Sequence, residues 1–336
     1  MTDPVVPQPA PVDPAPPIPA EPILPYPPDP KTPHKKWLVL VGGGACGRWQ
    51  AGALENLYKS GVLNNLVGIV GTSVGGLNAV ALAAGLAQGK GTDVLKMTWS
   101  MISKDENVYT PSITAITANP LLHIPEELGG ATGVILGCGF CSTDPLKSLV
   151  DGVLGSMTTD EVKAKTGIDV YVRAYDNSKG QDVTLQGRLV DMGLATSAIE
   201  VLFPAYKGFS DGGISNNSPI NIALNTQADQ IVVVYCGPED PGQSYAPQTI
   251  DQNTPDPNTK ALSVALGYLS HITQANEALV DSIATAAEQN GIEVIYCYPT
   301  KDTGSSLDFS SVELYARGLA ESGQAVVVAQ TMGWIS

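Results

Sequence analysis

The sequence predicts an α/β protein, a sandwich in which helices cover a mainly parallel sheet. Short apolar stretches typical of buried strands alternate along the chain with longer segments of helical periodicity, as in parallel sheets with helical crossovers. The chain has 336 residues, of which 43% are hydrophobic and 15% charged, so it can bury a large core. No internal repeat is visible, and we expect one folded domain.

Two strand–turn–helix units open the folded part. The apolar run Trp37–Val41 predicts a strand, and Arg48–Ser60 predicts a helix because its apolar residues fall on one face. Leu66–Val70 predicts a second buried strand, followed by a helix of small residues over Val74–Ala87. The stretch Gly68–Gln88 has no charge, but its glycines and polar residues divide it into strand, turn and helix. We therefore expect no transmembrane helix there.

The second half of the chain continues the alternation. The turn-rich sequence "DNSKGQ" separates two strand-like stretches and predicts a hairpin. The other expected elements are helices at Pro145–Met157 and Thr159–Lys165, strands at Ile168–Tyr175, Asp182–Leu189, Gln230–Cys236 and Glu293–Cys297, and long helical patterns at Lys260–Gln289 and Ser311–Gln330.

The first 33 residues differ from the rest in composition, because they contain 14 of the 26 prolines. Such a segment cannot form helix or sheet ladders, so we expect a disordered tail over residues 1–34 and a folded domain over residues 35–336. Several P-x-x-P spacings occur in the tail. A stiff spacer is the favoured interpretation, and a ligand for a partner protein is the alternative.

Charge and cysteine content exclude several classes of function. The net charge of −15 argues against nucleic acid as a partner, because phosphate binding needs clustered Lys and Arg. The five cysteines are scattered, which indicates reduced thiols rather than a disulfide framework. The chain begins without a basic segment followed by an apolar core, so we expect no secretory signal and a cytoplasmic location.

The glycine turn after the first expected strand has the spacing G-x-G-x-x-G at Gly42, Gly44 and Gly47. In a dinucleotide-binding fold the second strand should end in an acidic residue about 20 residues later. Here that strand runs into "GTSVGG" with no carboxylate. No G-K-[ST] follows the glycines, so a P-loop is excluded as well. A nucleotide-binding enzyme is thus the weaker interpretation of this turn.

The second strand leads instead into a G-x-S-x-G motif, with Ser73 between Gly71 and Gly75. A serine on a sharp strand-to-helix turn needs glycines beside it because neighbouring Cβ atoms would clash. Such a turn exposes the hydroxyl and directs the N–H groups of the following helix toward it. A glycine-rich structural turn is the alternative, but the location between strand and helix favours a nucleophile.

The glycine turn then has a different role. If Ser73 attacks a carbonyl group, the tetrahedral intermediate carries an oxyanion that needs preorganised hydrogen-bond donors. The first two strands of a parallel unit commonly lie side by side, so both turns can open at one edge of the sheet. We therefore expect an oxyanion hole in the turn formed by Gly42, Gly43, Gly44, Ala45 and Gly47, above all from the N–H groups of residues 43 to 45.

The base that would activate Ser73 is not a histidine. Of the three histidines, His34 lies in the tail, His123 in "NPLLHIP" and His271 within a helical pattern, and none suits a Ser-His-Asp triad. Asp211 is the better choice, because it begins a turn with Gly212 and Gly213. Such a turn can leave the carboxylate partly desolvated, which raises its pKa and makes it a stronger base.

Together these three stretches resemble the patatin-like phospholipases, with the likeness extending from about residue 37 to residue 235. The resemblance implies a three-layer α/β/α sandwich and a lipid acyl hydrolase with a Ser-Asp dyad, in which Ser73 is the nucleophile and Asp211 the general base. It implies no metal and no cofactor. The implied substrate is a phospholipid or another acyl-ester lipid at a membrane or micelle surface, so peripheral membrane attachment is compatible with it.

Two residues depart from the family pattern. Cys46 stands where the family usually has Arg or Lys, with Arg48 two residues later as a substitute cation. Glu200 stands where the family often has proline. The alternative function is therefore a catalytically weak or dead lipid-binding scaffold whose tail recruits a partner. The charge-poor segment 107–143 is either a lid or acyl-chain groove, or a buried insertion; its Cys138 and Cys141 are expected to be thiols rather than half a zinc site.

Overall fold

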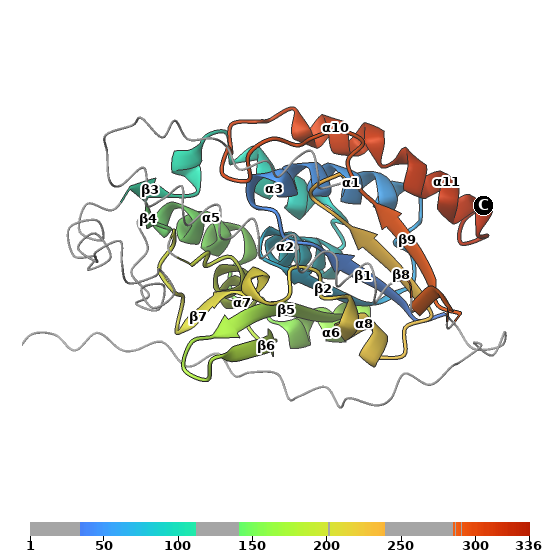
Figure 1. Cartoon of the computed structure of the whole chain (residues 1–336), viewed down its shortest axis with the longest axis horizontal. Helices are drawn as coiled ribbons and strands as arrows, with labels where there is room; N and C mark the ends of the chain where they lie inside the picture. Colours follow the sequence, from blue (N-terminus) through green and yellow to red (C-terminus); the bar gives the residue numbers. More distant parts are fainter. Residues whose placement is uncertain (1–33, 112–140, 201, 239–284, 286, 290) are drawn as a thin grey trace, which may run out of the picture.

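A computed structural model of the chain describes residues 34–111, 141–200, 202–238, 285, 287–289 and 291–336 (Figure 1). Some expectations fall on residues outside this set. These are the proline-rich tail, His123, His271, Cys138, and most of the segments 107–143 and 260–289. The expected boundary between tail and domain stays a prediction.

The described strands form one central sheet in the order β6-β5-β2-β1-β8-β9, with β7 added to β5 (Figure 1). All pairs among β5, β2, β1, β8 and β9 are parallel, whereas β6 and β7 run antiparallel to β5. The mainly parallel α/β sheet expected from the sequence is confirmed. The strands are β1 (Lys36–Leu40), β2 (Leu66–Thr72), β5 (Asp169–Asp176), β6 (Gln181–Leu185), β7 (Phe209–Asp211), β8 (Gln230–Val234) and β9 (Glu293–Cys297), and a separate pair is formed by β3 (Thr110–Pro111) and β4 (Cys141–Ser142).

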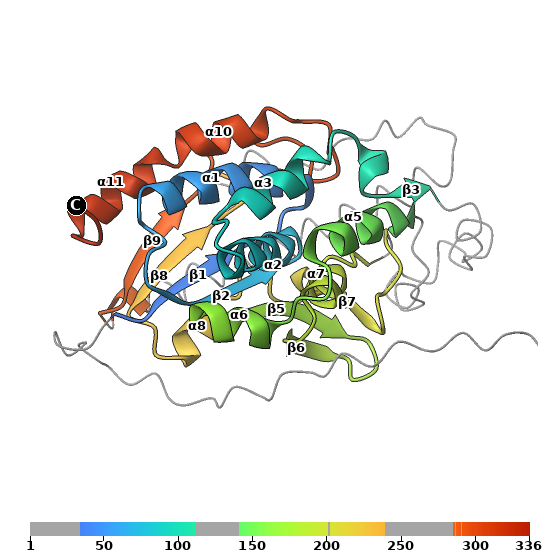
Figure 2. The ribbon, with the colours of Figure 1, turned by 180° about the vertical axis from the view of Figure 1, so that it is seen from behind.

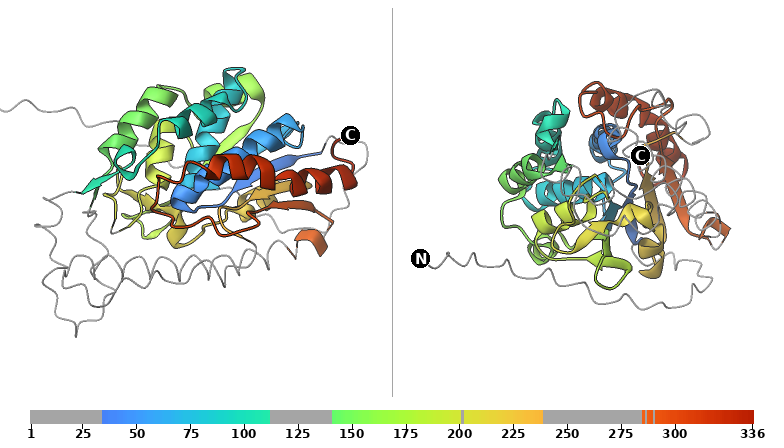
Figure 3. Two further views of the ribbon diagram at one scale, coloured as in Figure 1. Left: turned by 90° about the horizontal axis from the view of Figure 1, so that it is seen from above. Right: turned by 60° about the vertical axis from the view of Figure 1, so that its left-hand side comes forward.

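Helices lie along the sheet, as Figures 2 and 3 show from further directions. The α-helices are α1 (Gly47–Lys59), α2 (Val74–Ala87), α3 (Asp93–Ser100), α5 (Asp144–Leu154), α6 (Thr159–Thr166), α7 (Leu189–Thr196), α8 (Ile220–Asn225), α10 (Leu314–Glu321) and α11 (Gly323–Thr331), and short 3-10 turns occur at Gly44–Cys46, Asp105–Asn107 and Gly212–Ile214. In both Figure 1 and Figure 2 the helix α10 lies alongside α1.

Both faces of the sheet are covered, and β1 shows why. Leu38 and Leu40 point to one face, where they join a large apolar core with α1, α2 and α7. Trp37 and Val39 point to the other face and pack with residues of α8. A strand that is buried on both faces has a continuous run of apolar residues rather than an alternating pattern, and the sequence of β1 has such a run.

Some elements differ from the expectation. The predicted strand Asp182–Leu189 stops at Leu185, because Gly187 adopts a φ of 124° and α7 begins at Leu189. The long helical pattern Ser311–Gln330 divides into α10 and α11 around Ser322, whose hydroxyl accepts a hydrogen bond from Asn56 at 3.0 Å. Serine followed by glycine is a weak helix-forming pair, so a tertiary contact can stop the helix there. The helices α3, α7 and α8 and the short strand β7 were not expected.

Candidate active site

Ser73 lies at the sharp turn between β2 and α2. Its backbone has φ 56° and ψ −131°, a combination that residues with a Cβ rarely adopt. The flanking glycines are required by close backbone approach. A Cβ on Gly71 would lie 2.3 Å from the carbonyl oxygen of Gly75, and a Cβ on Gly75 would lie 2.3 Å from that of Leu40. The G-x-S-x-G spacing therefore corresponds to a strained strand-to-helix turn.

Strand β5 determines how Ser73 and Asp211 lie relative to each other. Along one edge β5 pairs with β2, and Thr72 lies opposite Arg173. The next residue, Ala174, pairs with Asp211 of β7, which continues along that edge where β2 ends; the other edge is taken by β6. Because Ser73 follows Thr72 directly, the structure brings residues 73 and 211 to the same level of the sheet.

The carboxylate of Asp211 is almost fully buried, with 4% of the residue exposed. Burial raises its pKa to about 7, although the nearby Ser73 hydroxyl and the Gly213 N–H both act to lower it. Oδ1 accepts a hydrogen bond from the Gly213 N–H at 2.7 Å. Oδ2 is buried and accepts no well-aligned hydrogen bond from a described residue. The Ser73 hydroxyl thus lies near the carboxylate without forming a well-aligned hydrogen bond to it.

The glycine turn is held from two sides, which occupies some of its N–H groups. The Gly42 N–H donates to the Asn217 carbonyl at 3.1 Å, and the Ala45 N–H donates to the Ser306 carbonyl at 2.7 Å. The Gly47 N–H bonds to carbonyl groups within the turn itself. These three residues of the predicted oxyanion hole are thus already hydrogen-bonded, and they hold the turn in place.

The N–H groups of Gly43 and Gly44 differ, because neither donates to any residue in the described part of the chain. Gly44 has a φ of 56° and lines the same pocket as Ser73. A Cβ on Gly44 would also lie 2.1 Å from the Ser306 carbonyl oxygen, so a larger residue does not fit. Of the predicted set, residues 43 and 44 are the ones whose N–H groups have no partner among the described residues.

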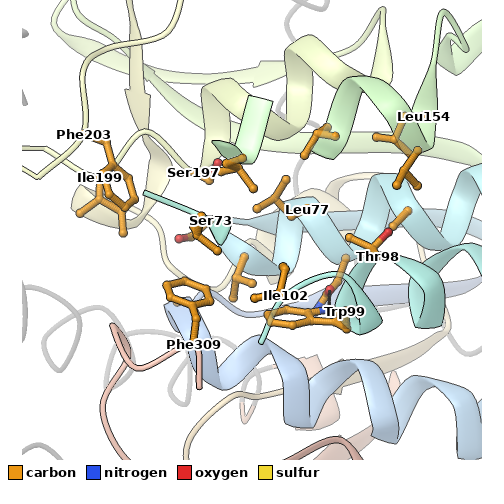
Figure 4. Close-up of a pocket in the computed structure, with 18 residues that line it drawn as sticks. Ser73, Leu77, Thr98, Trp99, Ile102, Leu154, Ser197, Ile199, Phe203 and Phe309 are labelled. Atoms are coloured by element: carbon orange, nitrogen blue, oxygen red, sulfur yellow. Dashed lines mark hydrogen bonds between the residues drawn. The ribbon is translucent and has the colours of Figure 1, made fainter. Parts of the chain in front are cut away.

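An apolar pocket extends from Ser73 into the molecule (Figure 4). Its volume is about 660 Å³, including the open space at its mouth. Ser73 and Gly44 line it together with side chains from three helices and the adjoining turns; among them are Leu77 and Ala81 of α2, Trp99 and Ile102 in or after α3, Val150 and Leu154 of α5, and Phe203 and Phe309. The nucleophile candidate thus stands beside a cavity whose chemistry suits a hydrocarbon chain.

The model of the patatin-like phospholipase family matches residues 38–224, more than half of the chain. This chain belongs to the patatin-like phospholipase family. Family membership supports lipid acyl hydrolase activity in general and a lipid substrate. No curated protein sequence matches the chain.

Two solved structures are similar to this patatin-like protein, and at their low identity the likeness concerns the fold. VipD from Legionella pneumophila is 15% identical, with a TM-score of 0.40, over 88% of this chain and 67% of that chain. The type III effector protein ExoU is 14% identical, with a TM-score of 0.40, over 89% of this chain and 53% of that chain. The chain thus spans about half the length of ExoU.

Cys46, which departs from the family pattern, and Arg48, the expected substitute cation, both have defined contacts. The Cys46 thiol faces the carbonyl groups of Thr303 and Gly304, and burial raises its pKa to about 11, so it is neutral. The Arg48 guanidinium does not take the place of the missing cation. It donates to the carbonyls of Ile102 and Phe309, and it lies 5.3 Å from the centre of the Trp99 ring. Arg48 therefore contacts three residues that line the pocket.

Sequence reasoning missed Thr196, which holds the strained turn. Its hydroxyl accepts a hydrogen bond from the Ser73 N–H at 2.9 Å and donates one to the Arg173 carbonyl at 2.5 Å. The side chain is fully buried. Within "ATSAIE" nothing marked this threonine, because its partners lie on β5 and in the turn after β2, far away in the sequence.

Asn217 is a second residue with an unrecognised contact. Its carbonyl accepts from the Gly42 N–H, and its side-chain amide lies 3.4 Å from the Gly42 carbonyl oxygen. A Cβ on Gly42 would overlap this side chain. The neighbouring Asn216 carbonyl accepts a hydrogen bond from Thr72 at 2.9 Å. The segment after Asp211 thus contacts both turns of the site. Its sequence "SNNSP" predicts a turn but does not indicate these contacts.

The described ranges contain no group of three or more His, Cys, Asp or Glu side chains that could hold a metal ion. The helices within those ranges are too short or too polar to cross a bilayer. Of the described cysteines, Cys46, Cys141 and Cys297 are free thiols.

Proposed function

We propose that this protein is a serine lipid acyl hydrolase that cleaves fatty-acyl esters of the phospholipase A or lysophospholipase type. The observation that carries the proposal is the meeting of Ser73 and the buried Asp211 at one level of β5, beside the apolar pocket. Family membership supports the class of reaction.

In the proposed first step, Asp211 accepts the proton of the Ser73 hydroxyl as Oγ forms a bond to the acyl carbonyl carbon. The carbonyl oxygen becomes an oxyanion, for which the free N–H groups of Gly43 and Gly44 are the proposed donors. When the intermediate collapses, the ester C–O bond breaks, and the leaving alcohol takes the proton from Asp211. The acyl group remains on Ser73.

The second step repeats this chemistry with water. Asp211 takes a proton from a water molecule, whose oxygen attacks the acyl carbonyl carbon. Collapse of this intermediate breaks the bond to Ser73 Oγ, which recovers its proton, and the fatty acid leaves. We place its hydrocarbon chain between α2, α3 and α5, where burying each methylene group contributes about 0.8 kcal/mol.

The test is hydrolysis of a panel of phospholipids and short-chain esters by wild type, Ser73→Ala and Asp211→Asn. We expect both variants to lose roughly a thousandfold or more in kcat/KM, because removing a nucleophile or its base has effects of this order. Ser60→Ala is the matched control, since its hydroxyl only bonds to the Leu57 carbonyl at the end of α1. Hydrolysis by Ser73→Ala at the wild-type rate would contradict the proposal.

The lipid-binding scaffold is the second candidate, and the neutral Cys46 in place of a cation favours it. A serine-reactive phosphonate probe separates the two functions. We expect the probe to label wild type and the Ser60→Ala control but not Ser73→Ala. Absence of labelling in wild type, together with binding of fatty acid, would establish the scaffold instead.

A further inference from the structure

Glu200 is a buried acidic residue that the proposed reaction does not use. It lies in the turn between α7 and β7, and 8% of the residue is exposed. Its neighbours Ile199 and Phe203 line the pocket. The turn is held against β7 by a hydrogen bond of 2.8 Å from the Asp211 N–H to the Ala198 carbonyl. Glu200 is thus placed beside the residue proposed as the base.

Three of the four carboxyl oxygens of these two residues lack well-aligned partners among the described residues. Oε1 and Oε2 of Glu200 and Oδ2 of Asp211 make up half of the six buried side-chain polar atoms without a hydrogen-bond partner in the described part of the chain. Burial raises the pKa of Glu200 well above its usual value, and the negative charge of Asp211 raises it further. The Ser210 hydroxyl and the N–H groups of residues 200 and 211 act in the opposite direction but do not outweigh burial.

The cations on neighbouring elements are engaged elsewhere. Arg173 of β5 forms an ion pair with Asp182 at 2.7 Å, and Lys207 forms one with Asp191 of α7 at 2.8 Å. Among the described ion pairs none includes Glu200. The charge facing Glu200 is therefore the negative charge of Asp211, and two adjacent buried carboxylates without a cation are strongly disfavoured.

We propose that Glu200 and Asp211 form a buried acid pair that carries at most a single negative charge at neutral pH, with the proton kept on Glu200 and any charge on Asp211. Glu200 is then a positioning residue, because it acts on the reaction only through the charge and location of the Asp211 carboxylate. The kinetic part of this inference rests on the proposed function, whereas the pairing itself does not.

The pair makes folding depend on pH in a defined direction. In the unfolded chain Glu200 ionises near pH 4.3, but in the folded protein it keeps its proton to a much higher pH. The folded state then binds more protons than the unfolded state, so stability falls as pH rises above about 4 and continues to fall until the folded pKa is passed. Asp211 contributes in the same direction up to about pH 7. A Glu200→Gln variant has no ionisable group at this position, so it does not lose the part of the folding stability that Glu200 loses as the pH rises.

Thermal unfolding of wild type, Glu200→Gln, Asp211→Asn and the double variant between about pH 5 and about pH 9 tests the pair. We expect the Tm of Glu200→Gln minus that of wild type to increase by at least about 2 °C from the acidic to the alkaline end of this range. We expect a smaller gain in the Asp211→Asn background, because the repulsion between the two carboxylates is gone. Glu106→Gln on the surface is the matched control, with a pH profile parallel to that of wild type. Parallel Tm curves for Glu200→Gln and wild type, or equal gains in both backgrounds, would overturn the pair.

Two further readouts test the inference, and the first does so even if Glu200→Gln does not fold. The infrared spectrum of wild type at about pH 8 should contain the C=O band of a buried carboxylic acid, and its absence would contradict a protonated Glu200. In kinetics, wild type should lose kcat/KM at alkaline pH as Glu200 ionises and its charge displaces the Asp211 carboxylate from the Ser73 hydroxyl, and Glu200→Gln should not. An inactive enzyme with the expected Tm profile would reject the proposed function and leave the acid pair standing.

Discussion

At the scale of single residues, the site depends on keeping Ser73 in an unfavourable backbone conformation. A residue with φ 56° and ψ −131° costs of the order of 1–3 kcal/mol and persists only when its surroundings fix it. The hydroxyl of Thr196 links the Ser73 N–H to the Arg173 carbonyl, and thereby ties the turn to the strand that also positions Asp211. Thr196 is therefore expected to determine how well the hydroxyl of residue 73 is aligned.

Replacing Thr196 by valine should reduce both stability and turnover. Valine has the same shape but leaves the Ser73 N–H and the Arg173 carbonyl without their partner, at a cost of about 1–3 kcal/mol in the free energy of unfolding. We expect kcat to fall at least about tenfold, because the relaxed turn misplaces the nucleophile. Thr196→Ser keeps the hydroxyl and is the control. Steady-state kinetics and thermal unfolding measure both effects, and a Thr196→Ser variant as slow as Thr196→Val would assign the loss to the missing methyl group instead.

The sequence predicts the structure best at residues whose role depends on a local motif. The turns around Ser73 and Asp211 could be located because glycine spacing reports backbone crowding within a few residues. The set Gly42, Gly43, Gly44, Ala45 and Gly47 could be placed as one turn, but which N–H groups stay free depends on the carbonyls of Asn217 and Ser306. Those partners are brought there by the fold, and no spacing in the sequence indicates them.

At the scale of secondary-structure elements, the pocket lies between helices that were only partly foreseen. Helix α2 begins and ends at the predicted residues, because an uncharged run after a strand leaves little choice. Helix α3 was missed, although it supplies Thr98 and Trp99 to the pocket. The apolar face of α3 is short, and a helix of eight residues gives a weak periodic signal. The presence of a pocket could thus not be derived from the sequence.

Narrowing the pocket on α2 should change the preference for acyl chain length. Ala81 lines the pocket and is 3% exposed, so Ala81→Leu adds side-chain volume inside it. If two methylene groups of the acyl chain can no longer be buried in the pocket, the expected reduction in kcat/KM for long-chain esters is about tenfold, at about 0.8 kcal/mol for each group. Short-chain esters, which do not reach Ala81, should be cleaved at the wild-type rate and serve as the internal control. An equal loss on short and long chains would mean that the acyl group binds elsewhere.

At the scale of the whole molecule, the site needs parts of the chain that lie beyond the matched region 38–224. The Ser306 carbonyl holds the Ala45 N–H, and the Phe309 carbonyl accepts from Arg48. Both residues precede α10, which packs on α1 in direct backbone contact: a Cβ on Gly318 would lie 2.0 Å from the Trp49 carbonyl oxygen. The packing of α10 on α1 therefore supports the turn that carries the free N–H groups of the site.

Gly318→Ala tests whether this packing supports the site. The added methyl group must push α10 away from α1, and overpacking of this kind costs about 1–3 kcal/mol, so we expect the Tm to fall by several degrees. Gly323→Ala is the matched control, because Gly323 lies in the first turn of α11 with no atom near its Cβ position, and alanine there should be neutral or slightly stabilising. We also expect Gly318→Ala to lower kcat, since a shifted Ser306 carbonyl loosens the glycine turn. If both variants unfold at the same temperature with unchanged kcat, α10 is an accessory helix and the site is complete without it.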